Sequence, residues 1–204
     1  MDIGYDTTEV SILSLGGIVL SRLIKTGGLK FDEAVRQTVR REFNLLIGQK
    51  TAATIRQSIG DLEKEGKGAV VYGRDIVVGL PVEREIPTDL INSCLEEHFN
   101  TIIDSVKVIL ERTPPELGAD IFKHGVYLTG GASQTSHFAE LLQKSTGLKV
   151  NQAQRPLESV VLGMGRILKE DMRNVNGSSG GSFIVLMSER SDEMAAKLIT
   201  QIQK

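Results

Sequence analysis

The first apolar residues of the chain fall into two short stretches separated by a pair of glycines. Residues 9–15 and 18–24 are rich in Val, Ile and Leu, and Gly16-Gly17 joins them. A glycine pair between two such stretches is typical of a β-hairpin. Residues 2–4 are expected to end another strand, and a strand that starts at its last residues suggests a chain cut from a longer protein.

The apolar residues then recur every three or four positions, which predicts an amphipathic helix over 31–46. A second helix is expected over 51–65, and a charged loop that contains glycine follows it. Residues 69–72 and 76–80 are expected to pair as a second hairpin around Gly73-Arg74.

The longest helix is expected from Pro87 to about Glu111, where Thr113-Pro114-Pro115 stops it because proline cannot donate a helical hydrogen bond. Cys94 and His98 fall on its apolar stripe, so both are expected to be largely buried. For His98 this structural role is favoured over that of a ligand or base. The remaining elements expected are a short buried strand over 126–129, a turn at Gly130-Gly131, a helix over 135–145, a strand near Val150 and a helix from Pro156 to about Lys169.

The last part of the chain differs in composition. Residues 177–182 read GSSGGS, which predicts a flexible linker over 170–182, either an engineered joint or a natural loop. Residues 183–204 are expected to form an appended strand and amphipathic helix. This segment is expected to dock as a partner-derived or relocated element, the alternative being an appendage without a biological role. The residues expected to make the contact are Phe183, Val185, Met194, Leu198 and Ile202.

Charge and composition exclude several classes of protein. The 204 residues carry 24 Lys and Arg against 26 Asp and Glu, and this balance argues against a nucleic-acid partner. Aromatic residues make up 4% and Trp is absent, so base-stacking platforms are not expected. The single cysteine fits a reducing compartment. No signal peptide is recognised and the apolar stretch over 10–20 is too short to span a bilayer, so a cytoplasmic protein is expected.

Two segments could contact a phosphate. Residues 2–9 offer backbone N–H groups and threonine hydroxyls at a strand end, and Asp2 could hold a hydrated Mg²⁺. The alternative is an ordinary polar turn. Residues 128–133 place Gly130-Gly131 between a strand and a helix, where a ligand could approach the backbone closely. For this second segment alone, a tight turn is the favoured interpretation.

Several further motifs occur together in one order along the chain. The most specific is LERTPPEL at 110–117, followed by Ala119-Asp120-Ile121. The others are SLGGIV at 14–19, NLLIG at 44–48, and GRD at 73–75 followed by GLP at 79–81. With these motifs the chain resembles the bacterial actin-like, rod-shape-determining MreB family. The resemblance covers Asp2 to about Lys169 and points to domain II, the second half of such proteins.

The resemblance implies an α/β fold of the actin/Hsp70/sugar-kinase type, which is ribonuclease H-like, with a small inserted α+β subdomain. Subdomain IIA would comprise residues 1–27 and 88–169, and subdomain IIB residues 28–87. In such proteins two halves clamp ATP and Mg²⁺. The nucleotide-binding positions that the resemblance implies here are Asp2, Gly4, Tyr5, Asp6, Thr7, Thr8, Ala53, Thr54, Arg56, Gly130, Gly131 and Ala132.

The chain departs from the family pattern at three of these places. The phosphate loop usually reads D-x-G-G-G-T-T, but Tyr5 and Asp6 stand for its second and third glycines. Ala132 replaces a third glycine, and Ala53 and Thr54 stand where two consecutive Glu residues are common. A tyrosine limits close approach and a carboxylate repels a triphosphate. A degenerate nucleotide site is therefore expected, with no ATP or Mg²⁺ bound by this fragment.

The function implied by the resemblance is filament formation that maintains cell shape, beneath the inner membrane of a bacterium. The fragment is expected to be catalytically inactive, since the first phosphate loop and the residue that activates water lie in the other half of such proteins. It is also expected to make no direct membrane contact, since the membrane-contacting parts lie in that other half. The alternative is half of an active ATP-binding ATPase or a sugar-kinase-like enzyme.

Overall fold

A mixed sheet and the helices packed on it form the larger part of the molecule. The computed structural model describes residues 1–15 and 17–174, with side chains as far as residue 168. Strands β1 (Asp2–Ile3), β2 (Thr8–Ser14) and β3 (Gly17–Ile24) pair antiparallel, as predicted for the hairpin. Strands β7 (Val126–Leu128) and β8 (Val150–Gln152) pair in parallel. A bridge between Asp2 and Thr129 joins the two groups in the order β3-β2-β1-β7-β8.

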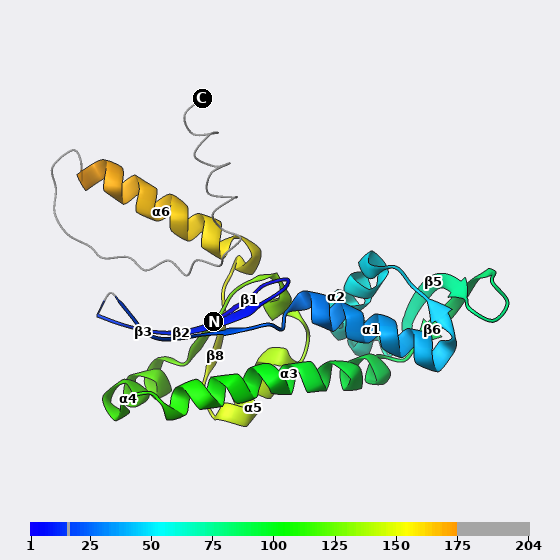
Figure 1. The fold of residues 1–204 in the computed structure, drawn as a ribbon, viewed down its shortest axis with the longest axis horizontal. Helices are drawn as coiled ribbons and strands as arrows, with labels where there is room; N and C mark the ends of the chain where they lie inside the picture. The colour runs from blue at the N-terminus through cyan, green and yellow to red at the C-terminus, as the bar shows by residue number, and fades with distance from the viewer. Residues whose placement is uncertain (16, 175–204) are drawn as a thin grey trace.

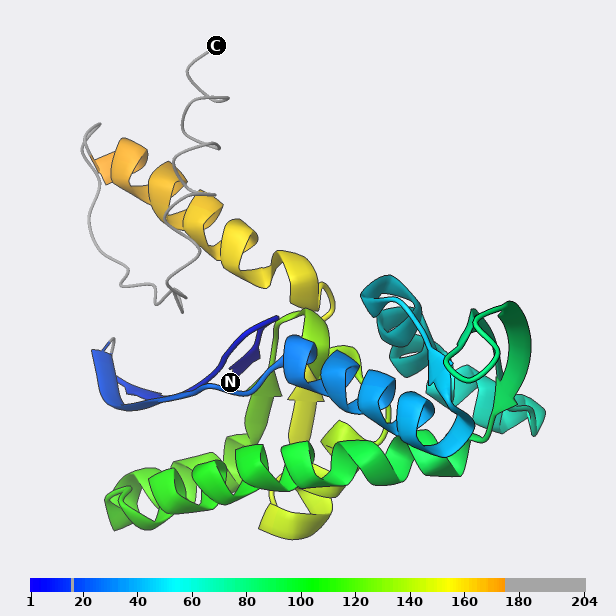
Figure 2. The ribbon, with the colours of Figure 1, turned by 45° about the vertical axis from the view of Figure 1, so that its right-hand side comes forward.

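Within residues 1–15 and 17–174, four helices accompany this sheet. Helix α3 (Thr88–Glu111) and helix α5 (Phe138–Thr146) lie on one side, and helix α4 (Pro115–His124) follows α3. Helix α6 (Ser159–Asn174) leaves on the other side after the short turns η1 (Gly131–Gln134) and η2 (Pro156–Glu158), as Figures 1 and 2 show.

A second group of elements is inserted between β3 and α3 and lies at the right of Figure 1. It contains helix α1 (Gly28–Phe43), helix α2 (Gln49–Glu65) and a small antiparallel sheet. The strands of that sheet are β4 (Leu45–Leu46), β5 (Ala69–Asp75) and β6 (Pro81–Ile86).

One hydrophobic core connects both groups. Three aromatic rings mark its centre: Phe99 of α3 lies edge-on to Phe31 of α1 and to Phe138 of α5, with ring centroids 5.3 Å and 5.2 Å apart. All three side chains are buried. The inserted elements are therefore packed on the same core as the larger sheet.

The predicted second hairpin has its turn and its second strand in the wrong place. Gly73-Arg74 was expected to be its turn, but β5 continues through both residues, and residues 76–80 connect the strands. The carboxylate of Asp75 makes this turn by accepting hydrogen bonds from the N–H groups of Val77 and Val78, at 2.8 Å and 3.0 Å. Gly73 lies inside strand β5. The residue there is a glycine because β4 passes so close that a side chain would meet the carbonyl oxygen of Leu46.

The ends of two predicted helices are also wrong. Helix α1 ends at Phe43 because Asn44 has a left-handed backbone, so Leu46 belongs to β4 and not to the helix. Helix α6 continues to Asn174, so residues 170–174 are helical and not part of a flexible linker. The rest of the predicted linker and the appended segment lie outside the described residues.

Two further predictions near α3 need correction. Helix α4 was missed, because Pro114-Pro115 reads as a stop although proline is well suited to the first turn of a new helix. The strand over 126–129 was expected to be buried, but only Leu128 is, while Tyr127 is exposed. The helix expected over 135–145 begins later, at Phe138.

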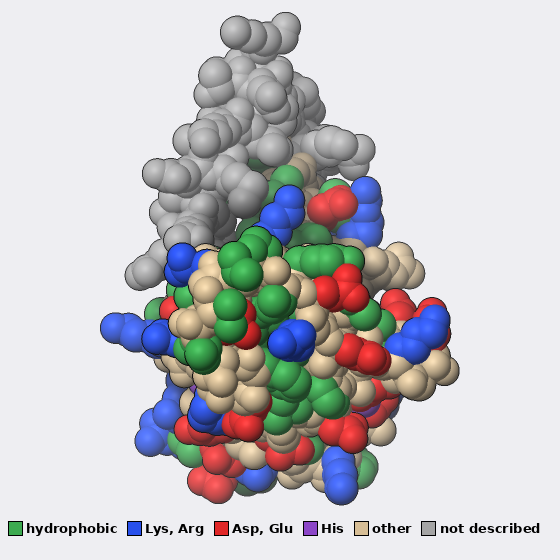
Figure 3. Space-filling model, turned by 90° about the vertical axis from the view of Figure 1, so that its right-hand side faces the viewer, with side chains coloured by type: hydrophobic (Ala, Val, Ile, Leu, Met, Phe, Trp, Pro, Cys, Tyr) green, Lys and Arg blue, Asp and Glu red, His purple; other side chains and the backbone are tan. Residues whose placement is uncertain are grey.

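The hairpin of β5 and β6 carries exposed apolar side chains. Figure 3 faces this end of the molecule, with hydrophobic side chains spread over its middle and most charged ones toward the margin. The exposed apolar residues of the hairpin are Val70, Tyr72, Ile76, Val77, Val78 and Leu80. Among the described residues, no helix is both long enough and apolar enough to cross a membrane.

Candidate nucleotide site

The three segments expected at a nucleotide meet at the start of α1. A β-carbon on Gly28 would lie 3.4 Å from Cβ of Ala132, 3.7 Å from Nη2 of Arg56 and 3.7 Å from Cδ2 of Tyr5. Tyr5 comes from the loop after β1, Arg56 from α2 and Ala132 from η1. The structure therefore brings one residue of each predicted segment to a single point, which we call the Gly28 junction.

Backbone groups of the loop over 2–8 bond within the loop and to the start of α1. Gly4 donates to the carbonyl of Thr7 at 2.9 Å. The first amides of α1, those of Gly28 and Leu29, donate to the carbonyls of Gly4 and Tyr5 at 3.0 Å and 2.7 Å. Helix N-termini bind anions through such amides. Here two of them are engaged by the loop instead.

The side chains of this loop differ in their surroundings. The Thr8 hydroxyl is buried and donates to the carbonyl of Thr26 at 2.7 Å. Tyr5 is 46% exposed, and its hydroxyl accepts a hydrogen bond from the Gln49 amide at the start of α2. Asp6 and Thr7 are half-buried beside it. The Tyr5 side chain thus reaches from the start of α1 to the start of α2.

Asp2 has the character of a cation ligand. It is 8% exposed, and its Oδ1 has no hydrogen-bond partner among the described residues. Burial raises the pKa of this carboxyl, the charge of Glu9 adds to the rise, and the Met1 amino group opposes it. Oδ1 packs against the backbone of Gly130, which has a positive φ of 85° and leaves no room for a side chain. An unpartnered carboxylate oxygen suits a hydrated Mg²⁺, although Gly130 covers it.

Arg56 is held in the interior and does not point to an open site. Its Nε lies 2.7 Å from Oδ1 of Asp32, and its Nη1 donates to the Thr135 hydroxyl at 2.8 Å. The guanidinium also stands 5.9 Å over the Phe31 ring. Neighbouring positions of α2 offer little more, since Ala53 is half-buried and apolar. The Thr54 hydroxyl donates to the carbonyl of Lys50 at 3.0 Å.

These donors do not fit a triphosphate. The amides of Gly4, Gly28 and Leu29 already have protein partners, as do Nε and Nη1 of Arg56. Tyr5 stands where the family pattern has a glycine. The part of the chain that the structure describes contains no group of three His, Cys, Asp or Glu side chains placed to hold a metal. Only Asp2 retains a feature that suits the expected ligand.

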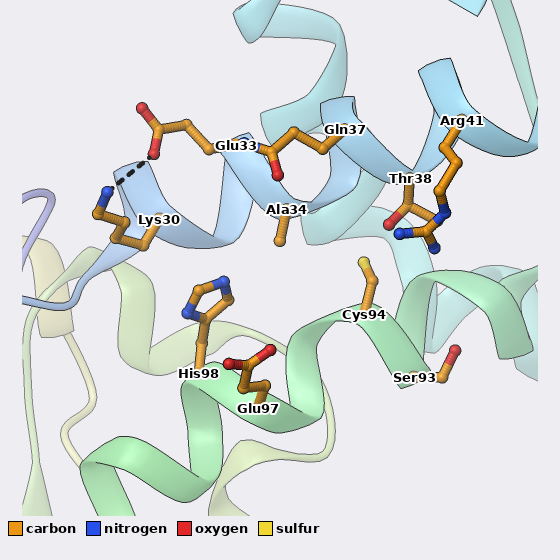
Figure 4. A pocket seen from close by; sticks show the side chains of 10 residues that line it. All are labelled: Lys30, Glu33, Ala34, Gln37, Thr38, Arg41, Ser93, Cys94, Glu97 and His98. Atoms are coloured by element: carbon orange, nitrogen blue, oxygen red, sulfur yellow. Dashed lines mark hydrogen bonds and ion pairs between the residues drawn. The ribbon is translucent and has the colours of Figure 1, made fainter. Parts of the chain in front are cut away.

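A polar cleft between α1 and α3 was not predicted from the sequence. It has a volume of about 340 Å³, and Figure 4 shows Cys94 and His98 pointing into it. Both were expected to be largely buried, and both are half-buried. Helix α3 turns Leu95 and Phe99 into the core, which leaves Cys94 and His98 at the edge of the α1 contact.

The sequence of α1 contained a signal of this polar cleft. Glu33, Gln37 and Arg41 recur at helical spacing and line the cleft. Arg36, Arg40 and Arg41 are exposed, as expected for solvated charges.

Comparison with known proteins identifies the family. The family described as MreB/Mbl protein matches residues 1–176. The chain belongs to the MreB/Mbl family. The cell shape-determining protein MreB of Escherichia coli K12 is 39% identical over 171 residues, which are 83% of this chain and 49% of that protein. Mbl of Bacillus subtilis 168 is 36% identical over 170 residues, covering 82% of this chain and 51% of that protein. The chain therefore spans about half the length of these MreB/Mbl relatives.

Solved structures confirm the actin-like fold. MreB5 of Spiroplasma citri bound to ADP superposes with a TM-score of 0.80 at 37% identity, covering 87% of this chain and 54% of that one. The same protein bound to AMPPNP gives 0.77 at 35% identity, covering 86% and 53%. The MamK double helical filament gives 0.62 at 21% identity over 76% and 49%, and supports the fold alone.

Proposed function

We propose that this chain is domain II of an MreB-like cytoskeletal protein, with subdomains IIA at 1–27 and 88–169 and IIB at 28–87, and with a degenerate nucleotide site. Membership of the MreB/Mbl family and the half-length match support the proposal that the chain is one domain of an MreB-like protein. The relatives are named as cell shape-determining proteins, which supports cell-shape maintenance as the activity to which the parent contributes. We propose that it does so by forming filaments.

The observation that carries the degenerate site is the filled Gly28 junction. Spiroplasma citri MreB5 has been solved with ADP and with AMPPNP, so nucleotide binding is the natural expectation for a relative at that identity. In this chain the Tyr5 hydroxyl is bonded to Gln49 of α2, and Arg56 is engaged with Asp32 and Thr135. We propose weak or absent ATP binding, and no hydrolysis by this chain alone.

Restoring the glycines tests this proposal. Thermal melting of the wild-type chain should not change with millimolar Mg-ATP, because a ligand stabilises the native state only when it binds. The double variant Tyr5→Gly/Asp6→Gly should gain a shift of a few degrees, and adding Asp2→Ala should remove it. A shift in the wild-type chain that Asp2→Ala abolishes would instead favour the rival function, half of an active ATP-binding enzyme.

Self-assembly is supported by the exposed apolar turn between β5 and β6. Val77 and Val78 are 77% and 67% exposed, and clustered exposed apolar residues mark protein interfaces. The double variant Val77→Ser/Val78→Ser should reduce assembly measured by sedimentation and electron microscopy. Leu15→Ser is the matched control, because Leu15 is also exposed but lies on the β2–β3 turn. Equal loss in both variants would count against a specific interface.

The remaining parts of the proposal concern location and partners. We propose a bacterial cytoplasmic location beneath the inner membrane, without a nucleic-acid partner and without direct membrane contact by these residues. The near balance of 24 basic and 26 acidic residues supports the absence of a polyanion partner. We also propose that residues 183–204 are a partner-derived or relocated docking element.

A further inference from the structure

One face of helix α2 is bound to the segment that precedes α5. Arg56, Gly60 and Glu63 are separated by four and three positions, so they lie on the same side of the helix. Each of them contacts one of the three consecutive residues 135–137, which belong to the elements around the larger sheet. We call this set of contacts the α2 seam. It joins the inserted elements to the rest of the molecule.

The first two contacts of the α2 seam are hydrogen bonds to hydroxyl groups. Nη1 of Arg56 donates to the Thr135 hydroxyl at 2.8 Å, and both residues are buried. The amide of Gly60 donates to the Ser136 hydroxyl at 3.1 Å. A β-carbon on Gly60 would come within 2.6 Å of that hydroxyl oxygen, so the glycine permits the close approach of the two segments.

Glu63 makes the third contact, at the more accessible end of the seam. Its Oε2 lies 2.6 Å from Nε2 of His137, and its Oε1 accepts a hydrogen bond from the Asn92 amide of α3. The side chains of Glu63 and His137 are 25% and 43% exposed, whereas that of Arg56 is 6% exposed. Water can therefore compete for the contacts of Glu63, while the Arg56 end of the seam is shielded.

His137 has a backbone conformation that needs support from its surroundings. Its φ is 66°, in the left-handed region that a residue with a side chain seldom adopts, and the residue caps the start of α5. Such a conformation persists only where neighbouring groups hold it. The imidazole lies between two carboxylates, that of Glu63 at 2.6 Å and that of Glu140 at 3.7 Å. Loss of the Glu63 contact removes one of these restraints.

An open cleft lies next to the Glu63 end of the seam. It has a volume of about 670 Å³ and is bordered by the end of α2, by β6 and by the start of α3. Three carboxylates line this cleft, those of Glu63, Glu85 and Asp89, together with the amine of Lys67. The excess of negative charge opposes a closer approach of the walls. This end of α2 therefore has space beside it and no apolar packing across the cleft to hold it.

We propose that the α2 seam is a latch with two positions, closed in this structure, and that Glu63 keeps it closed. Helix α1 is the hinge, because Phe31 of α1 is packed against Phe99 of α3 in the core. Opening moves the end of α2 away from residues 135–137. The closed position fixes the direction in which the β5–β6 turn points from the larger sheet. Its effect on assembly rests on the proposed function of that turn.

Pulsed electron paramagnetic resonance on the monomer measures the opening directly. Spin labels at Lys64→Cys on α2 and Lys144→Cys on α5, in a Cys94→Ala background, report the distance across the seam, and both lysines are exposed. We expect one distance when Glu63 is present and an additional, longer distance in Glu63→Ala. Glu65→Ala is the matched control, because Glu65 is an exposed carboxylate on the same helix, and it should retain the single distance.

Two further variants separate a latch from a contact that only stabilises the fold. Glu63→Gln should retain the single distance, because an amide can accept from Asn92 and donate to an imidazole nitrogen. His137→Gly should show the longer distance with little change in melting temperature, because glycine adopts a positive φ freely while the imidazole is lost. A single distance in both Glu63→Ala and His137→Gly would overturn the inference. An equal change in Glu65→Ala would do the same.

Sedimentation relates the latch to assembly. Glu63→Ala should assemble less than the wild type, although its β5–β6 turn is unaltered. Unchanged assembly of Glu63→Ala, with reduced assembly of Val77→Ser/Val78→Ser, would overturn the role of the latch in assembly. The distance measurement requires neither nucleotide nor filaments, so a failure of the latch is distinguishable from a failure of the proposed function.

Discussion

Arg56 and Asp32 form an ion pair inside the protein, with Nε 2.7 Å from Oδ1 and side chains 6% and 2% exposed. The pair joins α2 to α1, and the bond from Arg56 to Thr135 extends it to the turn before α5. The inserted elements are thus tied to the larger sheet by a buried charge as well as by the aromatic core. Arg56, which the family resemblance places at a nucleotide, therefore has a structural role in this chain.

We expect Arg56→Met to destabilise the protein by about 3–5 kcal/mol, because it leaves the Asp32 carboxylate buried without its partner. Urea unfolding measures the change directly. The double variant Arg56→Met/Asp32→Leu should recover much of the loss, since neither charge then remains. Lys64→Ala is the control, as Lys64 and Asp61 form an exposed pair, and it should change little. A single variant as stable as the wild type would contradict this account.

We expect Phe99→Ala to cost about 3–5 kcal/mol, as for other large aromatic residues removed from a core. Phe99 contacts the rings of both Phe31 and Phe138, so its loss opens a cavity between α1, α3 and α5. Phe122→Ala on α4 is the matched control, because Phe122 is exposed. Chemical denaturation that shows similar effects for both variants would place the core elsewhere.

Local patterns predicted most elements, and the failures have identifiable causes. Helix α3 runs from Thr88 to Glu111, close to its predicted ends, because a long apolar stripe and two prolines define it. The β5–β6 turn was misplaced because a Gly-Arg pair resembles a turn. The close approach of β4 to Gly73 is a long-range contact that no local pattern contains. The hydrogen bonds that Asp75 accepts from Val77 and Val78 are local, and the aspartate at the start of this turn was the signal that the sequence offered.

The candidate site, too, could be predicted from the sequence only in part. Its segments were identified from motifs and from their resemblance to a family, and the structure brings them together at Gly28. The burial of Arg56 could not be predicted, because its partner Asp32 lies on another helix and Thr135 is 79 residues away in the chain. The cleft beside Cys94 was missed because apolar residues recur every three or four positions both on a buried helix face and on its half-buried edge, so the sequence pattern does not distinguish the two.

We expect the β5–β6 turn to loosen at acidic pH. The N–H groups of Val78 and Val77 donate to the Asp75 carboxylate and lower its pKa. A carboxyl with a lowered pKa in the folded state contributes stability that is present above its unfolded-state pKa and is lost as the pH falls through the folded-state value. Amide hydrogen exchange at Val77 and Val78 should therefore accelerate below about pH 4, beyond the intrinsic effect of pH.

Substitution gives the control for this turn. Asp75→Ala should accelerate exchange at Val77 and Val78 at neutral pH and remove the acid-induced change. Asp61→Ala, which alters an exposed carboxylate on α2, should leave both amides protected as in the wild type. Unchanged protection in the Asp75 variant would mean that the backbone alone defines the turn.

We expect Cys94 to react slowly with thiol reagents at neutral pH, although it lines an open cleft. Burial raises the pKa of its thiol, while a hydrogen bond with Thr38 and the charge of Arg41 act in the opposite direction. The thiolate is the reactive form, so the labelling rate should rise with pH at higher values than for an exposed cysteine. The comparison is Lys64→Cys in a Cys94→Ala background, since Lys64 is exposed. Arg41→Gln should slow the labelling of Cys94 further, because it removes a charge that favours the thiolate. Labelling of Cys94 with the same pH profile as the exposed cysteine would show that α1 does not desolvate this edge of α3.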